Sequence, residues 1–237
     1  YLVTLLRRNS GEDTLIRDHN LRYANYQFTF ADVVRPGEPV SVDIRKTVNR
    51  VQQAGQIANR IVVRKAAGLV LIGFQRESVA PLCMPGLDIA DVGDLDGCED
   101  RSWVAGDRYF MKRKFLNTGN GKNFLAGSLV DQHCYFDELE NRVLFPAMFP
   151  VSLLSCALLE KARLEDYPFE ADPVVYTSHF ISIDRKLQEN LKSAGSGLGR
   201  KGFDQQLFRC FGVSPGNRVL FRAEVEMAPL REILSLP

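Results

Sequence analysis

The feature that most constrains the fold of this chain is the density of strand signals in residues 26–78. The turn Arg35–Pro39 and the tripeptide Ala66-Ala67-Gly68 separate short runs that alternate between apolar and polar residues or are mainly apolar. The predicted strands are 26–30, 40–48, 57–65 and 69–75. Four strands within about 50 residues leave no room for the crossover helices that parallel strands require. The segment therefore predicts an antiparallel sheet.

A second set of elements follows residue 104. We expect a strand at Tyr109–Leu116, a hairpin at Asn120-Gly121, and a returning strand at Phe124–Phe136. From Ser152 to Ala162 the residues are apolar nearly all round, which is typical of a buried helix, and Ser152 is a good N-cap. Further strands are predicted at 173–183 and 218–227. The polar stretch 186–206 is expected to be a loop or a frayed helix.

Charge and cysteine content exclude several classes of function. The 237 residues include 30 Lys and Arg against 29 Asp and Glu, a net charge of +1. This balance argues against electrostatic attraction to nucleic acid or to an anionic membrane, and no apolar run is long enough for a membrane span. The five Cys and three His show neither a C-x-x-C nor an H-x-x-x-H spacing. We therefore expect neither a metal site nor disulfides, and a cytoplasmic location.

The pattern divides the chain into two units. Leu2, Leu5 and Leu6 are spaced as in a helix that ends at Ser10-Gly11. We interpret it as the end of a helix whose beginning is absent. Residues 79–104 are rich in Pro, Gly and Asp, as in a linker. The predicted division is a first unit at 1–80, a linker at 81–104 and a second unit at 105–237.

This order of elements is similar to that of a known enzyme family. Phe145-Pro-Ala-Met-Phe-Pro-Val151, followed by a helix to Glu160, resembles the Phe-Pro segment and acid-bearing helix of the β-hydroxyacyl thioester dehydratases of fatty-acid and polyketide synthesis. The first eight residues are similar to the tail of a first central helix, and 28–74 to the strands that follow it. The resemblance covers about three quarters of the chain, and no single motif in it is diagnostic.

The resemblance implies an α+β double hotdog fold, in which antiparallel sheets each wrap around a central apolar helix. It implies a dehydratase-like domain acting on β-hydroxyacyl thioesters, with the acyl chain between helix and sheet. It implies no cofactor beyond the phosphopantetheine or CoA that carries the substrate. The implied partners are acyl carrier protein or acyl-CoA, together with a possible homodimer partner or other domains of a larger synthase.

The family's catalytic histidine has no counterpart, because Leu144 or Phe145 stands at its position. In one register of the resemblance Glu160 falls at the position of the family's acid, and in the other Leu159 does. His133 is the candidate for a substitute base, with His179 a further one. Ordinary structural roles compete with each of these assignments. Cys134 and Cys156 are candidate nucleophiles, although a buried Cys is usually an apolar filler.

Substrate contacts are predicted at two places. The free N–H groups near the helix start, at Val151, Ser152 and Leu153, are candidate donors to the thioester oxygen. Lys112 and Arg113 alternate with apolar residues and are candidates for a basic patch that meets carrier-protein acids or phosphates, or simply for the solvated face of a strand. The glycines of Gly195-x-Gly-x-Gly199 lack the flanking elements of a phosphate loop.

Two alternative functions stay open. A thioesterase on the same fold needs only a group that activates water, for which Glu160 or Asp131 would serve. A non-catalytic unit that binds an acyl chain or holds an assembly together would explain the missing histidine.

Overall fold

The computed structural model describes residues 2–95, 97–114, 116–128, 130–188, 195–199, 207–214, 216 and 218–234. The strands in this part of the chain are β1 (Tyr23–Phe30), β2 (Ser41–Ile44), β3 (Val48–Arg50), β4 (Gln56–Lys65), β5 (Gly68–Ser78), β6 (Ser102–Val104), β7 (Tyr109–Lys112), β8 (Phe136–Asp137), β9 (Arg142–Val143), β10 (Val174–Asp184), β11 (Gly195–Gly199), β12 (Leu207–Ser214) and β13 (Arg218–Pro229). The helices are α1 (Leu2–Asn9), α2 (Thr14–Asp18), α3 (Val51–Ala54), η1 (Ala90–Val92), α4 (Thr118–Ala126), η2 (Gln132–Cys134), α5 (Phe149–Leu164), α6 (Arg185–Gln188) and α7 (Leu230–Leu234).

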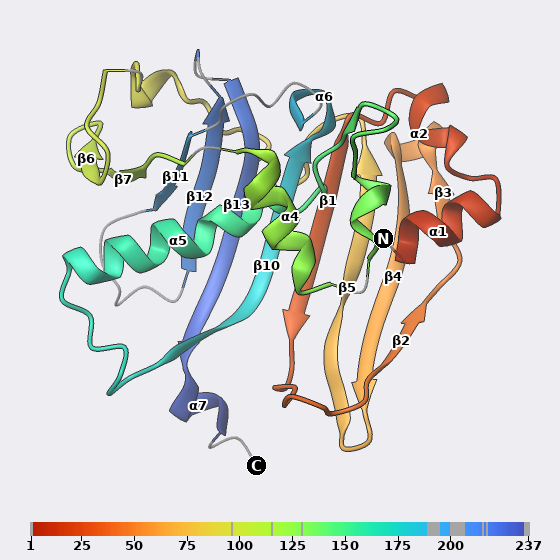
Figure 1. Cartoon of the computed structure of the whole chain (residues 1–237), viewed down its shortest axis with the longest axis horizontal. Coiled ribbons are helices and arrows are strands. Elements are labelled where there is room, and N and C mark those ends of the chain that lie inside the picture. Colours follow the sequence, from red (N-terminus) through yellow and green to blue (C-terminus); the bar gives the residue numbers. More distant parts are fainter. Residues whose placement is uncertain are drawn as a thin grey trace.

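One long antiparallel sheet dominates the molecule. Its strand order is β2-β4-β5-β1-β10-β13-β12-β11-β7-β6, with β3 paired to β4. The helices α1 and α5 lie on the same face of this sheet, each in front of one half (Figure 1). The antiparallel sheet and the N-terminal helix predicted from the sequence are confirmed.

The two halves of the sheet meet where β1 pairs with β10. Tyr26 lies opposite Ile181, and Phe28 lies opposite His179, in a continuous antiparallel ladder. The first half is built from the strands before residue 79, and the second from those after residue 101. An antiparallel sheet with a helix against each half is the double hotdog arrangement, so the predicted α+β hotdog fold is confirmed.

The predicted apolar helix is α5, and its core position is confirmed. It begins at Phe149, three residues before the predicted Ser152, because Pro150 suits the first turn of a helix. Phe149, Leu154 and Leu158 pack in one core with side chains of β1, β10, β12 and β13. The helix is therefore enclosed along the face that meets the sheet.

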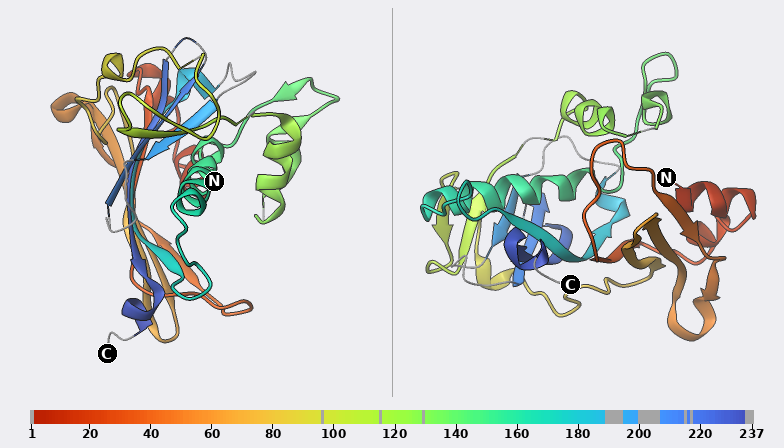
Figure 2. Two further views of the ribbon diagram at one scale, coloured as in Figure 1. Left: turned by 90° about the vertical axis from the view of Figure 1, so that its left-hand side faces the viewer. Right: turned by 90° about the horizontal axis from the view of Figure 1, so that it is seen from below.

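The strand predicted at Tyr109–Leu116 is confirmed over its first half, whereas the hairpin at Asn120-Gly121 and the returning strand at Phe124–Phe136 are wrong. The strand β7 ends at Lys112, and residues 118–126 form α4. The Asn117 side chain caps this helix by accepting the Asn120 N–H at 2.8 Å. Gly121 lies inside this helix, and only glycine fits there because a Cβ would be 2.6 Å from the Phe136 ring. Figure 2 shows α4 farther from the sheet than α5.

The segment predicted as a linker covers the other face of the sheet. Figure 2 shows it running along the side opposite α1 and α5. Leu82 and Cys83 donate their N–H groups to the Ser182 hydroxyl at 3.1 and 2.8 Å. Farther along, Val92 and Leu95 join a second core under β7 and β12. These residues pack as part of the fold, and the proposed domain boundaries remain a prediction.

The remaining strand predictions differ in detail. Strands β10 and β13 confirm the two C-terminal predictions, whereas β12 was not foreseen. The glycine-rich stretch 195–199 is strand β11, paired with β7 and β12. The remainder of the predicted loop, at 189–194 and 200–206, lies outside the described residues. In the part of the chain that the structure describes, no helix is long and apolar enough to cross a membrane.

The ladder between β5 and β1 depends on a glycine. A Cβ at Gly73 would lie 2.0 Å from the Gln27 carbonyl oxygen and 2.6 Å from the Phe28 ring. Because the first clash is with backbone, a side-chain rotation cannot relieve it. We expect Gly73→Ala to lower the free energy of unfolding by at least about 2 kcal/mol, measured by urea denaturation. Gly86→Ala is the control, since its Cβ meets nothing within 4 Å. Equal stability of both variants would contradict the packing described here.

Candidate functional site

The helix-side face of the junction between β1 and β10 is the candidate site. Tyr26 and Ile181 are buried there in the same core as α5. Phe28, Tyr176 and Met227 pack against that core and are only partly buried. The face therefore combines an apolar surface with a few polar side chains, as small-molecule sites usually do.

A β-bulge brings two of these polar side chains together. Tyr176 pairs with Met227 and Ser178 with Glu226, so Thr177 is the extra residue on β10. In a regular strand, residues three apart point to opposite faces. With the bulge, Tyr176 and His179 share one face, and their ring centroids are 4.6 Å apart at 73°.

His179 is a neutral base in apolar surroundings. Its ring also meets Phe30 edge-on, with 5.1 Å between the centroids. The Nε2 atom is buried and has no hydrogen-bond partner among the described residues. Burial lowers the pKa of His179 to about 4, because the charged imidazolium loses its hydration. At neutral pH the imidazole is therefore unprotonated.

Tyr176 is the matching proton donor. Its hydroxyl lies 3.0 Å from the Ser155 hydroxyl on α5, where either group could donate. Burial raises the pKa of Tyr176 above its usual value, and the hydrogen bond with Ser155 offsets part of that effect. The tyrosine is thus protonated at neutral pH beside an unprotonated histidine.

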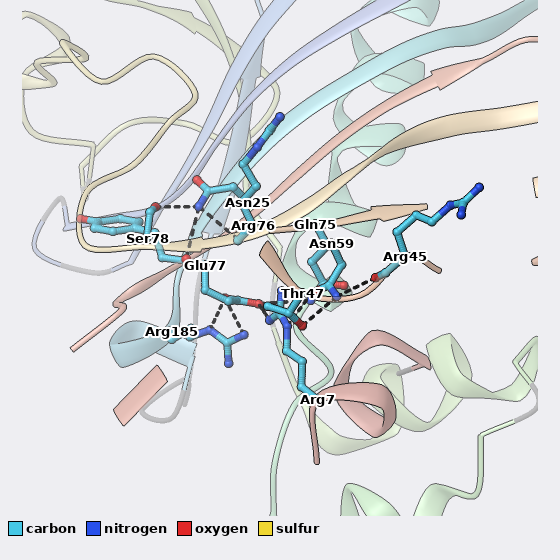
Figure 3. Close-up of polar contacts among 11 residues, drawn as sticks. Arg7, Asn25, Arg45, Thr47, Asn59, Gln75, Arg76, Glu77, Ser78 and Arg185 are labelled. Atoms are coloured by element: carbon cyan, nitrogen blue, oxygen red, sulfur yellow. Dashed lines mark hydrogen bonds and ion pairs between the residues drawn. The ribbon is translucent and has the colours of Figure 1, made fainter. Parts of the chain in front are cut away.

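A second polar group, the Glu77 cluster, lies on the same face of the first half-sheet (Figure 3). We define it as Arg7, Asn59, Gln75, Glu77 and Arg185. Glu77 Oε1 accepts from Arg7 Nη1 at 2.7 Å and from Gln75 Nε2 at 3.2 Å. Its other oxygen, Oε2, accepts from Arg185 Nε and Nη2 at 3.0 and 2.8 Å. Arg7 Nε donates to Asn59 Oδ1 at 2.8 Å.

The two polar groups lie at different levels along the junction. Glu77 pairs with Ala24, and Ala24 pairs with Ile183, which is four residues beyond His179 on β10. The spacings of residues and strands place the backbones of Glu77 and His179 roughly 16 Å apart. Tyr26 lies between the two levels. A ligand that contacts both groups must therefore be extended.

The structure places the predicted acid and base in different surroundings. Glu160, on α5, accepts from Arg101 Nε at 3.1 Å. His133 is exposed in η2, not on the predicted strand, and its backbone N–H and carbonyl bond to Asp131 and Arg142. The described contacts of these two residues have no partner in common. Their catalytic roles stay a prediction.

The predicted oxyanion donors are already engaged. The N–H groups of Val151 and Ser152 donate to the Met148 carbonyl at 3.1 and 3.2 Å, and Leu153 lies within the helix. The earlier N–H, of Phe149, donates to Pro146 at 2.9 Å. The start of α5 thus has its first donors satisfied by its own entry loop.

Lys112 and Arg113 are held by the protein itself. Lys112 is only 4% exposed and its Nζ lies 2.6 Å from Asp100 Oδ2. The Arg113 guanidinium donates to the carbonyls of Leu95 and Cys98 at 2.7 and 2.8 Å. Both cations bind groups of the segment before β6. The geometry therefore gives no support to the predicted basic patch.

The two candidate cysteines lie on different elements, and Cys156 is close enough to Tyr176 to affect its pKa. Cys134 is exposed in η2, and Cys156 is half-buried on α5. No group of His, Cys, Asp and Glu in the described part of the chain could hold a metal ion. His179 was a further candidate base in the sequence, whereas its pairing with Tyr176 was missed because a spacing of three indicates opposite faces of a strand, and nothing in the sequence marks the bulge.

Comparison with known proteins supports the fold. The chain matches no protein-family model and no curated protein sequence. Its structure is similar to that of a MaoC-like dehydratase from Phytophthora capsici, with a TM-score of 0.52 and 8% identity over 88% of this chain and 70% of that one. It is also similar to an acyl-ACP thioesterase from Bacteroides thetaiotaomicron, with a TM-score of 0.49 and 11% identity over 94% and 83% of the two chains. At 8% identity, the likeness to the MaoC-like dehydratase supports the double hotdog fold alone.

The lowered pKa of His179 predicts a pH dependence of stability. The unfolded chain takes up a proton near pH 6.5, whereas the folded chain does so only near pH 4. Stability from the neutral histidine is therefore complete above pH 6.5 and is lost as the pH falls toward 4. Between pH 6.5 and pH 5, we expect the free energy of unfolding of His179→Phe to fall by about 1–2 kcal/mol less than that of the unsubstituted protein, measured by urea denaturation. Parallel pH profiles would show that His179 titrates normally.

Proposed function

We propose that this protein acts on acyl thioesters at the junction of β1 and β10, and that its reaction is the dehydration of β-hydroxyacyl thioesters. The observation that carries the proposal is the pairing of Tyr176 with His179 on the face that meets α5, with 4.6 Å between their ring centroids. Dehydration needs one group that accepts the α-proton and one that protonates the departing hydroxyl. The neutral imidazole and the protonated phenol have these two capacities.

His179 and Tyr176 together account for every proton transfer in the dehydration. His179 takes the proton from Cα, the Cα–Cβ double bond forms, and the C–O bond to the β-hydroxyl breaks. Tyr176 donates its proton, so the hydroxyl leaves as water. Transfer of the proton from the imidazolium to the tyrosinate then restores both groups. Ser155, 3.0 Å from the Tyr176 hydroxyl, stabilises the transient tyrosinate by donating to it.

The acyl chain would lie along the apolar side chains between α5 and the sheet. Phe28, Met227 and Leu153 are partly buried hydrophobic residues that pack against the α5 core. They offer an apolar surface on both sides of the Tyr176–His179 pair. The proposed carrier of the acyl chain is acyl carrier protein or CoA, and this carrier supplies the phosphopantetheine arm.

The test is turnover of β-hydroxyacyl-CoA thioesters of several chain lengths, followed by mass spectrometry as loss of one water. We expect His179→Gln and Tyr176→Phe each to lower kcat by about 10²–10⁴-fold, the usual contribution of a general acid or base. His133→Ala and Glu160→Gln are the matched controls, with changes below about twofold. The reverse pattern would support the sequence-based assignment and overturn ours. Absence of turnover with the whole panel would overturn both.

Thioester hydrolysis is the second candidate, and one observation favours it. The Tyr176 hydroxyl is already bonded to Ser155, whereas the His179 ring has no hydrogen bond among the described residues. Hydrolysis needs only one base to activate water. Release of free thiol from saturated acyl-CoA, lost in His179→Gln and kept in Tyr176→Phe, would establish a thioesterase. Dehydration releases no thiol.

A further inference from the structure

The Glu77 cluster contains donors that the protein does not use. Arg7 is 2% exposed, and its Nη2 atom is buried with no hydrogen-bond partner among the described residues. A buried guanidinium N–H without an acceptor is costly and rare in folded proteins. The end of α1 thus holds a charged donor in place with nothing to receive it.

Glu77 cannot supply the missing acceptor. Its two oxygens accept four hydrogen bonds, from Arg7 Nη1, Gln75 Nε2, and the Nε and Nη2 atoms of Arg185. Four is the full capacity of a carboxylate. Asn59 Oδ1 is taken by Arg7 Nε, and the Asn59 amide donates to Arg45 and Thr47. None of the cluster's oxygens forms a hydrogen bond with Nη2 in the described structure, so this donor is open to an acceptor from outside the cluster.

Tyr26, on β1, adds a second donor between the Glu77 cluster and the level of His179. It lies beside Gln75 in the ladder between β1 and β5 and is 8% exposed. Its hydroxyl makes no hydrogen bond within the described part of the chain. Burial and the charge of Glu77 raise the pKa of Tyr26, and the charges of Arg185 and Arg7 act in the opposite direction. The phenol is thus a proton donor on the strand beside Gln75, whose amide shares Glu77 Oε1 with Arg7.

Charge indicates the kind of group that these donors suit. Taken together, Arg7, Arg185 and Glu77 carry a positive charge. A guanidinium fork binds carboxylate and phosphate oxygens through charge-assisted hydrogen bonds. The side chain of Arg185 is 34% exposed, so the cluster reaches the solvent on that side.

We propose that Arg7 Nη2 and the Tyr26 hydroxyl form a binding site for an oxyanion of the substrate, between the Glu77 cluster and the Tyr26 level of the junction. This inference rests on the proposed function, because it makes the Glu77 cluster the far end of the same acyl-thioester site. The anion is either a carboxylate at the end of the acyl chain or the phosphate of the pantetheine arm. Both present the same oxygens to a guanidinium.

Thioether analogues test the site without any chemistry. The probes are S-octyl-pantetheine, its 4′-phosphate, and an S-alkyl-pantetheine of equal length that ends in a carboxylate. Isothermal titration calorimetry measures their affinities at one ionic strength. We expect one anionic probe to bind about 10- to 100-fold more tightly than the neutral probe, the usual gain from a charge-assisted hydrogen bond. The probe that gains identifies the source of the anion.

Two variants connect the gain to the named donors. Arg7→Lys keeps the charge and loses the guanidinium fork, and Tyr26→Phe removes one hydroxyl that bonds to nothing in the described structure. Both are expected to lose most of the gain while binding the neutral probe as before. Arg22→Lys and Tyr23→Phe are the controls, because Arg22 is paired with the buried Asp184 and Tyr23 lies on the opposite face of β1.

The outcomes separate the two proposals. Equal affinity for all three probes, or a gain that survives in both Arg7→Lys and Tyr26→Phe, overturns the anion site and leaves the acyl-thioester function standing. Binding of an anionic probe without any binding of the neutral probe supports the anion site and contradicts the acyl function. If Arg7→Lys lowers the melting temperature by more than about 8 °C, Tyr26→Phe alone decides.

Discussion

The arrangement of the molecule depends on one buried carboxylate. Glu77 has no exposed surface, and a buried carboxylate is stable only when it is paired and hydrogen-bonded. Its partners come from different parts of the fold: Arg7 from α1, Gln75 from β5, and Arg185 from the residue that follows β10. Losing Arg7 would break the fully buried member of this pairing, at a cost of up to about 3–5 kcal/mol. The same interaction therefore fixes α1 on the first half-sheet and the end of β10 beside it.

The candidate site is a consequence of that fixed junction. Because β1 and β10 are held as one ladder, the bulge at Thr177 presents Tyr176 and His179 to α5 in a defined position. On the other face, Ser182 holds Leu82 and Cys83, so the crossing segment covers the back of the same two strands. The junction is thus enclosed from behind and polar in front. Chemistry that needs a fixed acid and base has a rigid support here.

The sequence predicts most of the fold, and of the candidate junction site it indicates His179 but not Tyr176, for physical reasons. Alternation and turn residues reveal β4, β5 and β10, and apolar content on all sides reveals α5, because these patterns follow directly from burial. Asn120-Gly121 is misread as a hairpin turn. The glycine is instead needed within a helix, where the Phe136 ring comes too close for a Cβ. Lys112 and Arg113 look solvated until Asp100 and the carbonyls around residue 95 are placed beside them. The Tyr176–His179 pair depends on a bulge. The position of the unpaired Arg7 Nη2 atom depends on Glu77, which binds the same guanidinium from 70 residues away.

Each half of the sheet packs against one helix, but the two contacts differ in chemistry. Under α5 the contact is apolar, with Phe149, Leu154 and Leu158 against the sheet. Under α1, Val3 is joined by a charged network in which Arg7 and Glu77 are only 2% and 0% exposed. Apolar packing would have stabilised α1 at least as well, since a buried ion pair rarely exceeds the hydrophobic contacts that could replace it. A network that is no better for stability and leaves a donor unused has a function in binding as its simplest physical explanation. The apolar half then suits an acyl chain, and the charged half suits an anion.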